Sequence, residues 1–182
     1  MRKQNYLDKI AIEIKKCKVC KKGSIGLPVP GEGNPNAKIV FVGEAPGKQE
    51  AKTGRPFVGR SGKFLRSQIQ AIGLDDEKDV FILSPVKYLP KGGTPTKQQI
   101  AHGRTHYLKQ IEIINPRIIV LMGNVAALGT LDKAISVSKF HGETLIESSK
   151  KYFFSYHPAA AVRFPKLRSV FVQDFKKLKK LI

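Results

Sequence analysis

Four short apolar runs, rich in β-branched and aromatic residues, mark the strands that the sequence predicts. Each run is apolar throughout or nearly so and ends at a turn signal or a polar cluster. An unbroken apolar run is typical of a strand that is covered on both faces, as in a parallel sheet. The four runs are Lys38–Val42, Val80–Leu83, Arg117–Met122 and Tyr152–Tyr156.

Between the runs, apolar residues recur at the spacing of one helix face. Thr96 and Gln99 form a T-x-x-Q capping box that opens one of these helices, and Asn115 followed by Pro116 ends it. Gly73 is placed to cap the end of another. The predicted helices cover 7–16, 61–72, 97–114, a segment beginning near Asn124, and 166–182.

Strands that alternate with helices predict an α/β fold, with three layers (α/β/α) and a central four-stranded, mostly parallel sheet. The length of 182 residues suits a single domain over 1–182. In such sheets the ligand site lies in loops beyond the carboxyl ends of the strands. The loops that follow the four runs read GEAPGKQE, SPVKYLP, GNVAA and HPAAAVR.

The charge balance points to a polyanionic partner. Lysine and arginine outnumber the acids 33 to 14, which gives a formal charge of +19. That exceeds what solubility needs, although a merely solvated basic surface is the simpler alternative. Neutralising phosphates with release of counterions is what such a charge favours, so we expect nucleic acid as the partner. No apolar run is long enough for a membrane span and no secretion signal is present, so we expect a cytoplasmic monomer.

The loop after the first run is rich in glycine and also carries acids and an aromatic residue. Glycines over 43–62 let backbone pass close to a ligand and present N–H groups to it. Neither G-x-G-x-x-G nor G-x-x-x-x-G-K-[ST] occurs, so nucleotide triphosphate binding has little support. A structural turn alone would not explain Glu44, Glu50 and Phe57 within the same short segment.

The loop after the last run begins with His157 and Pro158 and continues through three alanines. A lone histidine is more often structural than functional, but this one stands at a strand end before a basic and aromatic stretch. The small Ala159 and Ala160 allow a phosphate backbone to approach closely. The next three residues are of the kind that wedges into a base stack: Val162, Arg163 and Phe164.

Together, G-E-A-P-G, G-R-P-F-V-G-x-S-G and H-P-A-A-A resemble the motifs of the uracil-DNA glycosylase superfamily. They are most similar to the thermophile-type group called family 4, many of whose members bind an iron–sulfur cluster. The likeness also covers the C-x-x-C of Cys17 and Cys20 and the stretch KQIEIINPRIIVLMGNVA. It implies an enzyme that flips uracil out of DNA and hydrolyses its N-glycosidic bond, leaving an abasic site.

The resemblance also implies roles for single residues. Phe57 would stack on the flipped uracil, His157 would hydrogen-bond its O2, and a loop would supply backbone contacts through Gly43, Ala45, Pro46 and Gly47. A donor aimed at the developing uracil anion contributes about 3–4 kcal/mol in comparable oxyanion sites. A carboxylate near the sugar would orient the attacking water, and we favour Glu44 over Glu50 for proximity.

Cationic and small residues beside the two motif loops are the expected DNA contacts. The four lysines between 176 and 180 are better explained as the solvated face of the last helix. The expected DNA-binding residues are Arg60, Ser61, Lys63, Ala159, Ala160, Val162, Arg163 and Phe164, with Lys166 and Arg168 beside them.

Two features depart from the family pattern. Ser84 stands where the group has an asparagine that reads the uracil edge, so selectivity among bases could differ. Tyr88 and Arg104 stand at the third and fourth cluster cysteines, and Cys17 and Cys20 alone cannot hold a 4Fe-4S cubane.

Ligand count therefore favours a chain without a metal. Tyr88 and Arg104 would then replace the cross-link to the N-terminal helix by packing and hydrogen bonding. His102 or His106 could instead complete a zinc or mixed-ligand site, because Cys2His2 suits zinc.

The sequence leaves one main rival function and argues against two others. The missing asparagine is compatible with a DNA-binding module of the same fold that recognises a damaged base with weak or no excision. A nucleotide-binding α/β protein lacks its phosphate-loop signature. A redox protein would place its C-x-x-C at a helix start after a strand, whereas here it follows a predicted helix. A sliding-clamp or repair-protein partner is also left open.

Overall fold

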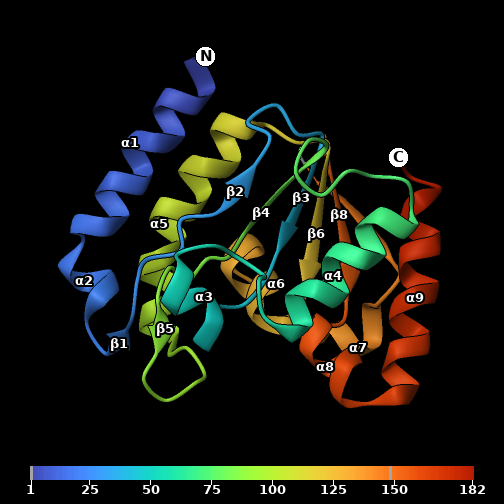
Figure 1. Ribbon diagram of the computed structural model, residues 1–182. Coiled ribbons are helices and arrows are strands. Elements are labelled where there is room, and N and C mark those ends of the chain that lie inside the picture. The colour runs from blue at the N-terminus through green and yellow to red at the C-terminus, as the bar shows by residue number, and fades with distance from the viewer. Residues whose placement is uncertain (1, 148) are drawn as a thin grey trace.

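The fold is built on one central sheet, seen in the computed structural model, which describes residues 2–147 and 149–182 (Figure 1). The strand order is β2-β4-β3-β6-β8-β7. The four inner strands are parallel and coincide with the four predicted runs to within two residues at each end. They are β3 (Ile39–Val42), β4 (Val80–Leu83), β6 (Ile118–Met122) and β8 (Lys150–Ser155).

The predicted strand number of four was too low, because an antiparallel strand closes each edge of the sheet. β2 (Glu32–Gly33) pairs with β4, and β7 (Thr144–Glu147) pairs with β8. β2 has two residues and neither is apolar, and all four residues of β7 are exposed. Neither strand therefore has the buried pattern by which the inner strands were predicted. A separate two-stranded ribbon joins β1 (Ser24–Ile25) to β5 (Leu89–Pro90).

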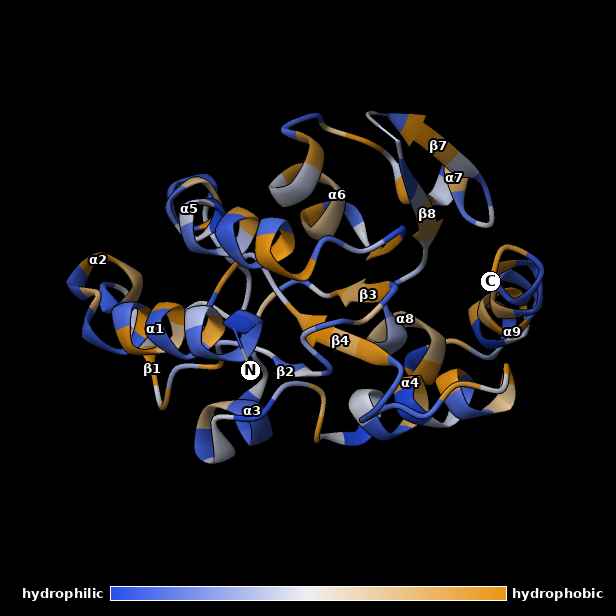
Figure 2. Cartoon of the chain, turned by 90° about the horizontal axis from the view of Figure 1, so that it is seen from above, coloured by the Kyte–Doolittle hydropathy of each residue, from blue (hydrophilic) through white to orange (hydrophobic). Residues whose placement is uncertain are grey.

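Helices cover both faces of the sheet, as the unbroken apolar strands predict (Figure 2). One face packs against α1 (Arg2–Lys16), α5 (Lys97–Ile114) and α6 (Asn124–Leu131). The other packs against α4 (Arg60–Ala71), α8 (Pro158–Arg163) and α9 (Pro165–Lys179). The short helices are α2 (Lys18–Lys21), α3 (Lys48–Thr53) and α7 (Val137–Phe140).

Alternate residues of each inner strand enter opposite halves of the core. In β3, Ile39 and Phe41 join the cluster under α4 and α9, whereas Val40 and Val42 join the cluster under α5 and α6. All four are at most 2% exposed. The sheet is therefore a rigid support, and loops anchored at its carboxyl edge are fixed relative to one another.

The capping signals were confirmed. The Thr96 hydroxyl accepts the Gln99 N–H, and the Gln99 side chain accepts the Thr96 N–H, at the start of α5. Asn115 ends that helix in the left-handed region at φ 51°. Within the described ranges, no helix has the length and apolar character needed to cross a bilayer.

Candidate active site

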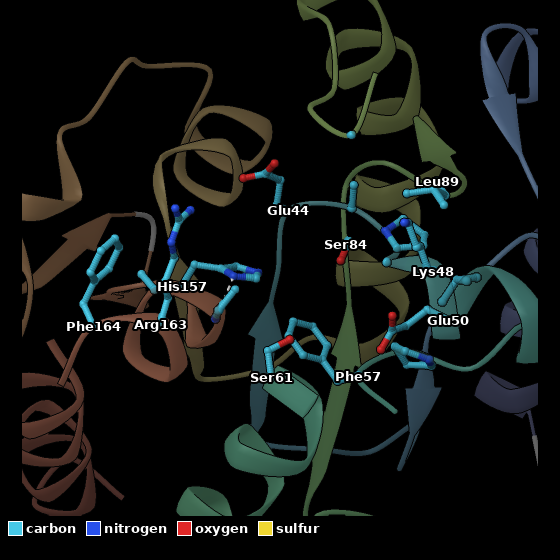
Figure 3. Close-up of a pocket in the computed structure, with 18 residues that line it drawn as sticks. Glu44, Lys48, Glu50, Phe57, Ser61, Ser84, Leu89, His157, Arg163 and Phe164 are labelled. Carbon is cyan, nitrogen blue, oxygen red and sulfur yellow. Dashed lines mark hydrogen bonds between the residues drawn. The ribbon is translucent and has the colours of Figure 1, made fainter. Parts of the chain in front are cut away.

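A cavity of about 590 Å³ opens at the carboxyl ends of β3, β4 and β8 (Figure 3). Three of the four loops shortlisted from the sequence contribute to its wall. The fourth contributes indirectly, because Gly123 at the end of β6 leaves room for His157: a Cβ there would lie 3.3 Å from that of the histidine. The predicted residues that line the cavity are Glu44, Ala45, Pro46, Gly47, Glu50, Phe57, Ser61, Ser84, His157, Ala159, Ala160, Arg163 and Phe164.

Phe57 holds an uncommon backbone conformation at the floor of the cavity, with φ 52°. A non-glycine residue in this region is held there by its surroundings. Gly43 and Gly62 make the fit possible. A Cβ on Gly43 would come within 2.5 Å of the Phe57 ring, and one on Gly62 within 2.1 Å of the Phe57 carbonyl carbon. Gly43 therefore lies beneath the aromatic ring and does not line the cavity.

Two charged side chains fix the turn that carries Phe57. The Glu50 Oε1 atom accepts the N–H groups of Val58 and Gly59, each at 2.8 Å. Arg66 donates to the carbonyls of Phe57 and Pro56, both at 3.1 Å. Glu50 is buried, at 9% exposure. This carboxylate, predicted as a catalytic candidate, therefore has a clear structural task.

Arg66 was not anticipated from the sequence. Besides the two carbonyls, its guanidinium forms ion pairs with Glu32 and Asp76. A single arginine inside an amphipathic helix gives no signal of such a role, because its partners are supplied by the edge strand β2 and the loop after α4.

His157 caps α8 and presents one ring nitrogen to the cavity. Its Nδ1 accepts the N–H of Ala159 at 3.2 Å, so the proton of the neutral ring resides on Nε2. Nε2 is buried and has no hydrogen-bond partner within the described part of the chain. Burial lowers the pKa of His157 to about 4, while the charge of Glu50 acts in the opposite direction. The ring is therefore neutral at pH 7, with an N–H donor free for a ligand.

The rings of Phe57 and His157 lie side by side, with centroids 5.9 Å apart and planes at 36°. In Figure 3 both point toward the centre of the cavity, and Ser84 lies across from them. Ser84, at 8% exposure, is close to the backbone of Gly43. An aromatic surface, a ring N–H donor and a hydroxyl thus converge on one space, which suits a flat heterocycle with polar edges.

Glu44 also faces the cavity and is half-buried. Burial raises the pKa of this carboxyl above its ordinary value. Whereas one oxygen of Glu50 is taken up by the turn at 58–59, no hydrogen bond to the Glu44 carboxylate is found among the described residues. Of the two candidates, Glu44 has its carboxylate oxygens available for a water or a substrate.

The rim of the cavity is basic. Arg163 is exposed and lies over the ring of Phe164, 5.3 Å from its centroid, and Phe164 is 48% exposed. Lys48, which the sequence analysis did not single out, also lines the cavity. Arg60 and Lys63 are exposed on α4 outside it. Such a rim would receive a phosphate backbone.

Val162 is placed differently from its predicted role. It packs against the core beneath α4 and α9 and does not line the cavity. Of the three residues expected to wedge into a base stack, only Arg163 and Phe164 are exposed at the mouth.

The family model of the uracil DNA glycosylase superfamily matches residues 30–179, which include every element of this cavity except Val29. The chain belongs to this superfamily. It is 40% identical to the Type-4 uracil-DNA glycosylase of Sulfurisphaera tokodaii, covering 96% of this chain and 84% of the relative. It is 36% identical to the Type-4 enzyme of Thermotoga maritima, covering 99% of this chain and 96% of the relative. It is 37% identical to that of Archaeoglobus fulgidus, covering 96% of this chain and 92% of the relative.

The iron–sulfur cluster that the family resemblance implies does not fit the residues present. Cys17 and Cys20 meet two imidazoles, His102 and His106, and both cysteines are free thiols. A cubane is held by four thiolates. Tyr88 does not face this group as a ligand: its hydroxyl donates to the backbone carbonyls of α1.

Proposed function

We propose that this protein excises uracil from DNA, acting as a monofunctional uracil-DNA glycosylase that leaves an abasic site. Family membership supports the reaction. The single structural observation that carries the proposal is the neutral His157, whose buried Nε2–H has no partner in the described structure and faces a cavity floored by Phe57.

The proposed reaction breaks the bond between C1′ of the deoxyribose and N1 of uracil. The nucleotide is first flipped out of the helix, because its glycosidic bond is inaccessible inside the stack. The Phe57 ring then stacks on the base. As the bond breaks, the electron pair passes to uracil, and His157 Nε2–H donates to the oxygen on which negative charge develops. Such a preorganised donor contributes about 3–4 kcal/mol to transition-state stabilisation.

Glu44 supplies the second requirement. The sugar becomes oxocarbenium-like as uracil departs, and water must then attack C1′. An ionised carboxylate beside the sugar stabilises the cation, orients that water and accepts the proton it loses, while the uracil anion takes a proton from solvent. Its half-buried position strengthens both effects, because the local dielectric is lower than in bulk water.

A neutral histidine suits this chemistry better than a charged one. Burial holds the pKa of His157 near 4, so the ring is neutral at pH 7. The folded protein therefore does not bear the cost of burying a charged ring. Because Ala159 N–H occupies Nδ1, the ring cannot rotate freely or change tautomer without losing a hydrogen bond. The donor is therefore fixed in direction before substrate arrives.

DNA is the partner that the surface supports. The formal charge is +19, and Arg163, Lys48 and Phe164 border the cavity mouth. Phosphates flanking the flipped nucleotide would lie beside Arg163 and Lys48, with the small Ala159 and Ala160 permitting close approach. The monomeric state and the cytoplasmic location stay predictions.

The test is an excision assay on oligonucleotides that carry uracil opposite guanine, opposite adenine or unpaired, with hypoxanthine as a side substrate. We expect release of free uracil and alkali-sensitive abasic sites, both lost in His157→Ala. Because Ser84 replaces the expected asparagine, the alternative is a DNA-binding module that recognises damage without cleaving. Gel-shift binding of uracil-containing DNA with no release of base would favour that alternative.

A further inference from the structure

Four potential metal ligands gather outside the cavity that holds His157, where the N-terminal segment meets α5. Cys17 caps the short helix α2 and Cys20 lies one turn later. His102 and His106 are four residues apart on α5 and so share one face of that helix. We call these residues the Cys/His group. Their ligand atoms all lie within 4.8 Å of one another.

The spacing fits a single metal ion. With metal–sulfur bonds of about 2.3 Å and metal–nitrogen bonds of about 2.0–2.1 Å, a tetrahedral site holds its ligand atoms about 3.3–3.8 Å apart. The Cys17 Sγ to His102 Nε2 distance is already 3.1 Å. A cluster with two irons would divide the ligands between two metals and separate them further. The Cys/His group is too compact for that, and it has too few thiolates for a cubane.

A second observation, on His106, also points to metal binding. Both ring nitrogens of His106 are buried and lack a hydrogen-bond partner among the described residues. Leaving a buried polar group without a partner is unfavourable, so such groups often belong to a binding site for water or an ion. The Glu13 carboxylate lies 4.0 Å from His106 Nδ1, which is beyond hydrogen-bond length. Neither ring nitrogen is therefore committed to a protein partner, so one of them is available to bind a metal.

The residues that replace the family's other two cysteines do not compete for this position. Tyr88 is buried and its hydroxyl lies 3.4 Å from the carbonyls of Ile14 and Lys15. Arg104 points away, with its guanidinium 4.0 Å from Asp132 at the end of α6. The Cys20 N–H donates to Cys17 Sγ at 3.4 Å, which fixes the Cys17 side chain at the start of α2.

We propose that Cys17, Cys20, His102 and His106 bind one Zn²⁺ ion that joins the N-terminal helices to α5. Two thiolates and two imidazoles suit zinc, and four protein ligands complete a tetrahedron with no open position for substrate. The site is therefore structural. In this proposal a zinc ion with two cysteines and two histidines replaces the iron–sulfur cluster that the family resemblance implies.

The test is the metal content of the purified full chain, measuring zinc, iron and acid-labile sulfide together. We expect about one zinc per chain, with iron and sulfide near zero. Cys17→Ser and His106→Ala should each lose most of the zinc. His141→Gln, which alters a histidine outside the Cys/His group, is the matched control and should retain it. His106→Cys should also retain zinc, because the cysteine thiolate can bind the metal in place of the imidazole.

Thermal unfolding provides a second readout. A strong chelator should lower the Tm of the wild type and of His141→Gln, but leave that of His106→Ala unchanged. Cobalt added to metal-free protein should give the visible bands of a tetrahedral thiolate site. If His106→Ala does not fold, His106→Cys and the cobalt spectrum still decide. A folded wild type that lacks zinc, or one that contains iron with sulfide, would overturn the proposal.

Discussion

The two carboxylates of the cavity should separate cleanly under mutation, because the structure gives them different tasks. Glu50 holds the turn that carries Phe57, and Glu44 has its carboxylate available for substrate or water. We compare Glu50→Gln and Glu50→Ala with Glu44→Gln. The glutamine variant at 50 keeps an oxygen that can accept both N–H groups, whereas alanine keeps none.

The magnitudes follow from the two 2.8 Å hydrogen bonds to Glu50 Oε1. Leaving a buried donor unsatisfied costs about 1–3 kcal/mol. Val58 and Gly59 are only half-buried, so water offsets part of this and we expect a total of about 2–3 kcal/mol for Glu50→Ala. Glu50→Gln loses the contribution of the charge alone, about 1 kcal/mol.

The effect of Glu50→Ala on activity follows from Phe57. Its left-handed backbone conformation costs of order 1–3 kcal/mol and persists only while its neighbours hold it. Without Glu50 the turn can relax and the ring can leave the floor of the cavity. Excision should therefore fall together with stability in Glu50→Ala, and remain within about tenfold of wild type in Glu50→Gln.

Glu44→Gln should behave in the opposite way. Burial raises the folded-state pKa of Glu44, so the favourable contribution of this carboxyl is present at low pH and is lost as pH rises through that pKa. At neutral pH a neutral glutamine should leave the free energy of unfolding unchanged or raise it. Excision should fall by about 10²-fold or more, because the charge near the sugar is gone.

The assay pairs urea unfolding with single-turnover release of uracil at saturating enzyme, so that weak binding does not mask a chemical defect. The reasoning would be refuted if Glu50→Gln lost as much activity as Glu44→Gln while unfolding like the wild type. That result would make Glu50 the carboxylate that acts on the sugar.

Three further predictions concern the rest of the site. His157→Ala should lower excision about 10²–10³-fold with DNA affinity nearly unchanged. Equal activity in the variant would remove histidine from the mechanism. NMR titration of the wild-type ring should give a pKa of about 4. Arg163→Ala should weaken binding to all DNA sequences and reduce the slope of log K against log salt concentration by about one. Lys176→Ala, near the end of α9 and outside the cavity, should not. An unchanged slope for Arg163→Ala would place this side chain away from the phosphates. Ser84→Asn should retain or raise uracil excision, measured against cytosine and thymine oligonucleotides as specificity controls, and an inactive variant would mean that the base is read by other groups.

The features that depend on local pattern were predictable from the sequence. The four inner strands were found because residues such as Val40 and Phe41 are buried on opposite faces, which leaves no polar position in the run. The capping box at Thr96 and the loops beyond the strand ends followed from equally local rules. The edge strands β2 and β7 were missed because exposed or two-residue strands have no apolar signature.

Features that depend on distant contacts were not predictable. The sequence suggests Glu50 as a second catalytic acid. Its structural role appears only in the fold, where residues 58–59 turn back and donate two backbone N–H groups to its Oε1. Helical spacing places His102 and His106 on one face of α5. Their contact with Cys17 depends on how the N-terminal helices pack against α5, because Cys17 and His102 are 85 residues apart in the sequence. Val162 follows a functional motif yet is drawn into the core.

The segment that runs from α2 to β2 determines how short the chain can be made while the cavity stays complete. The family model of the superfamily matches from residue 30 onward, but Val29 already forms part of the cavity wall. The N–H of Val29 donates to the Lys87 carbonyl, and the buried Lys87 amine donates in return to the Pro30 carbonyl. A shortened chain cut at the family boundary would retain Glu44, Phe57 and His157 and still lose one wall of its pocket. Grafts, fusions and minimal versions of this enzyme should therefore include Val29 and the residues just before it.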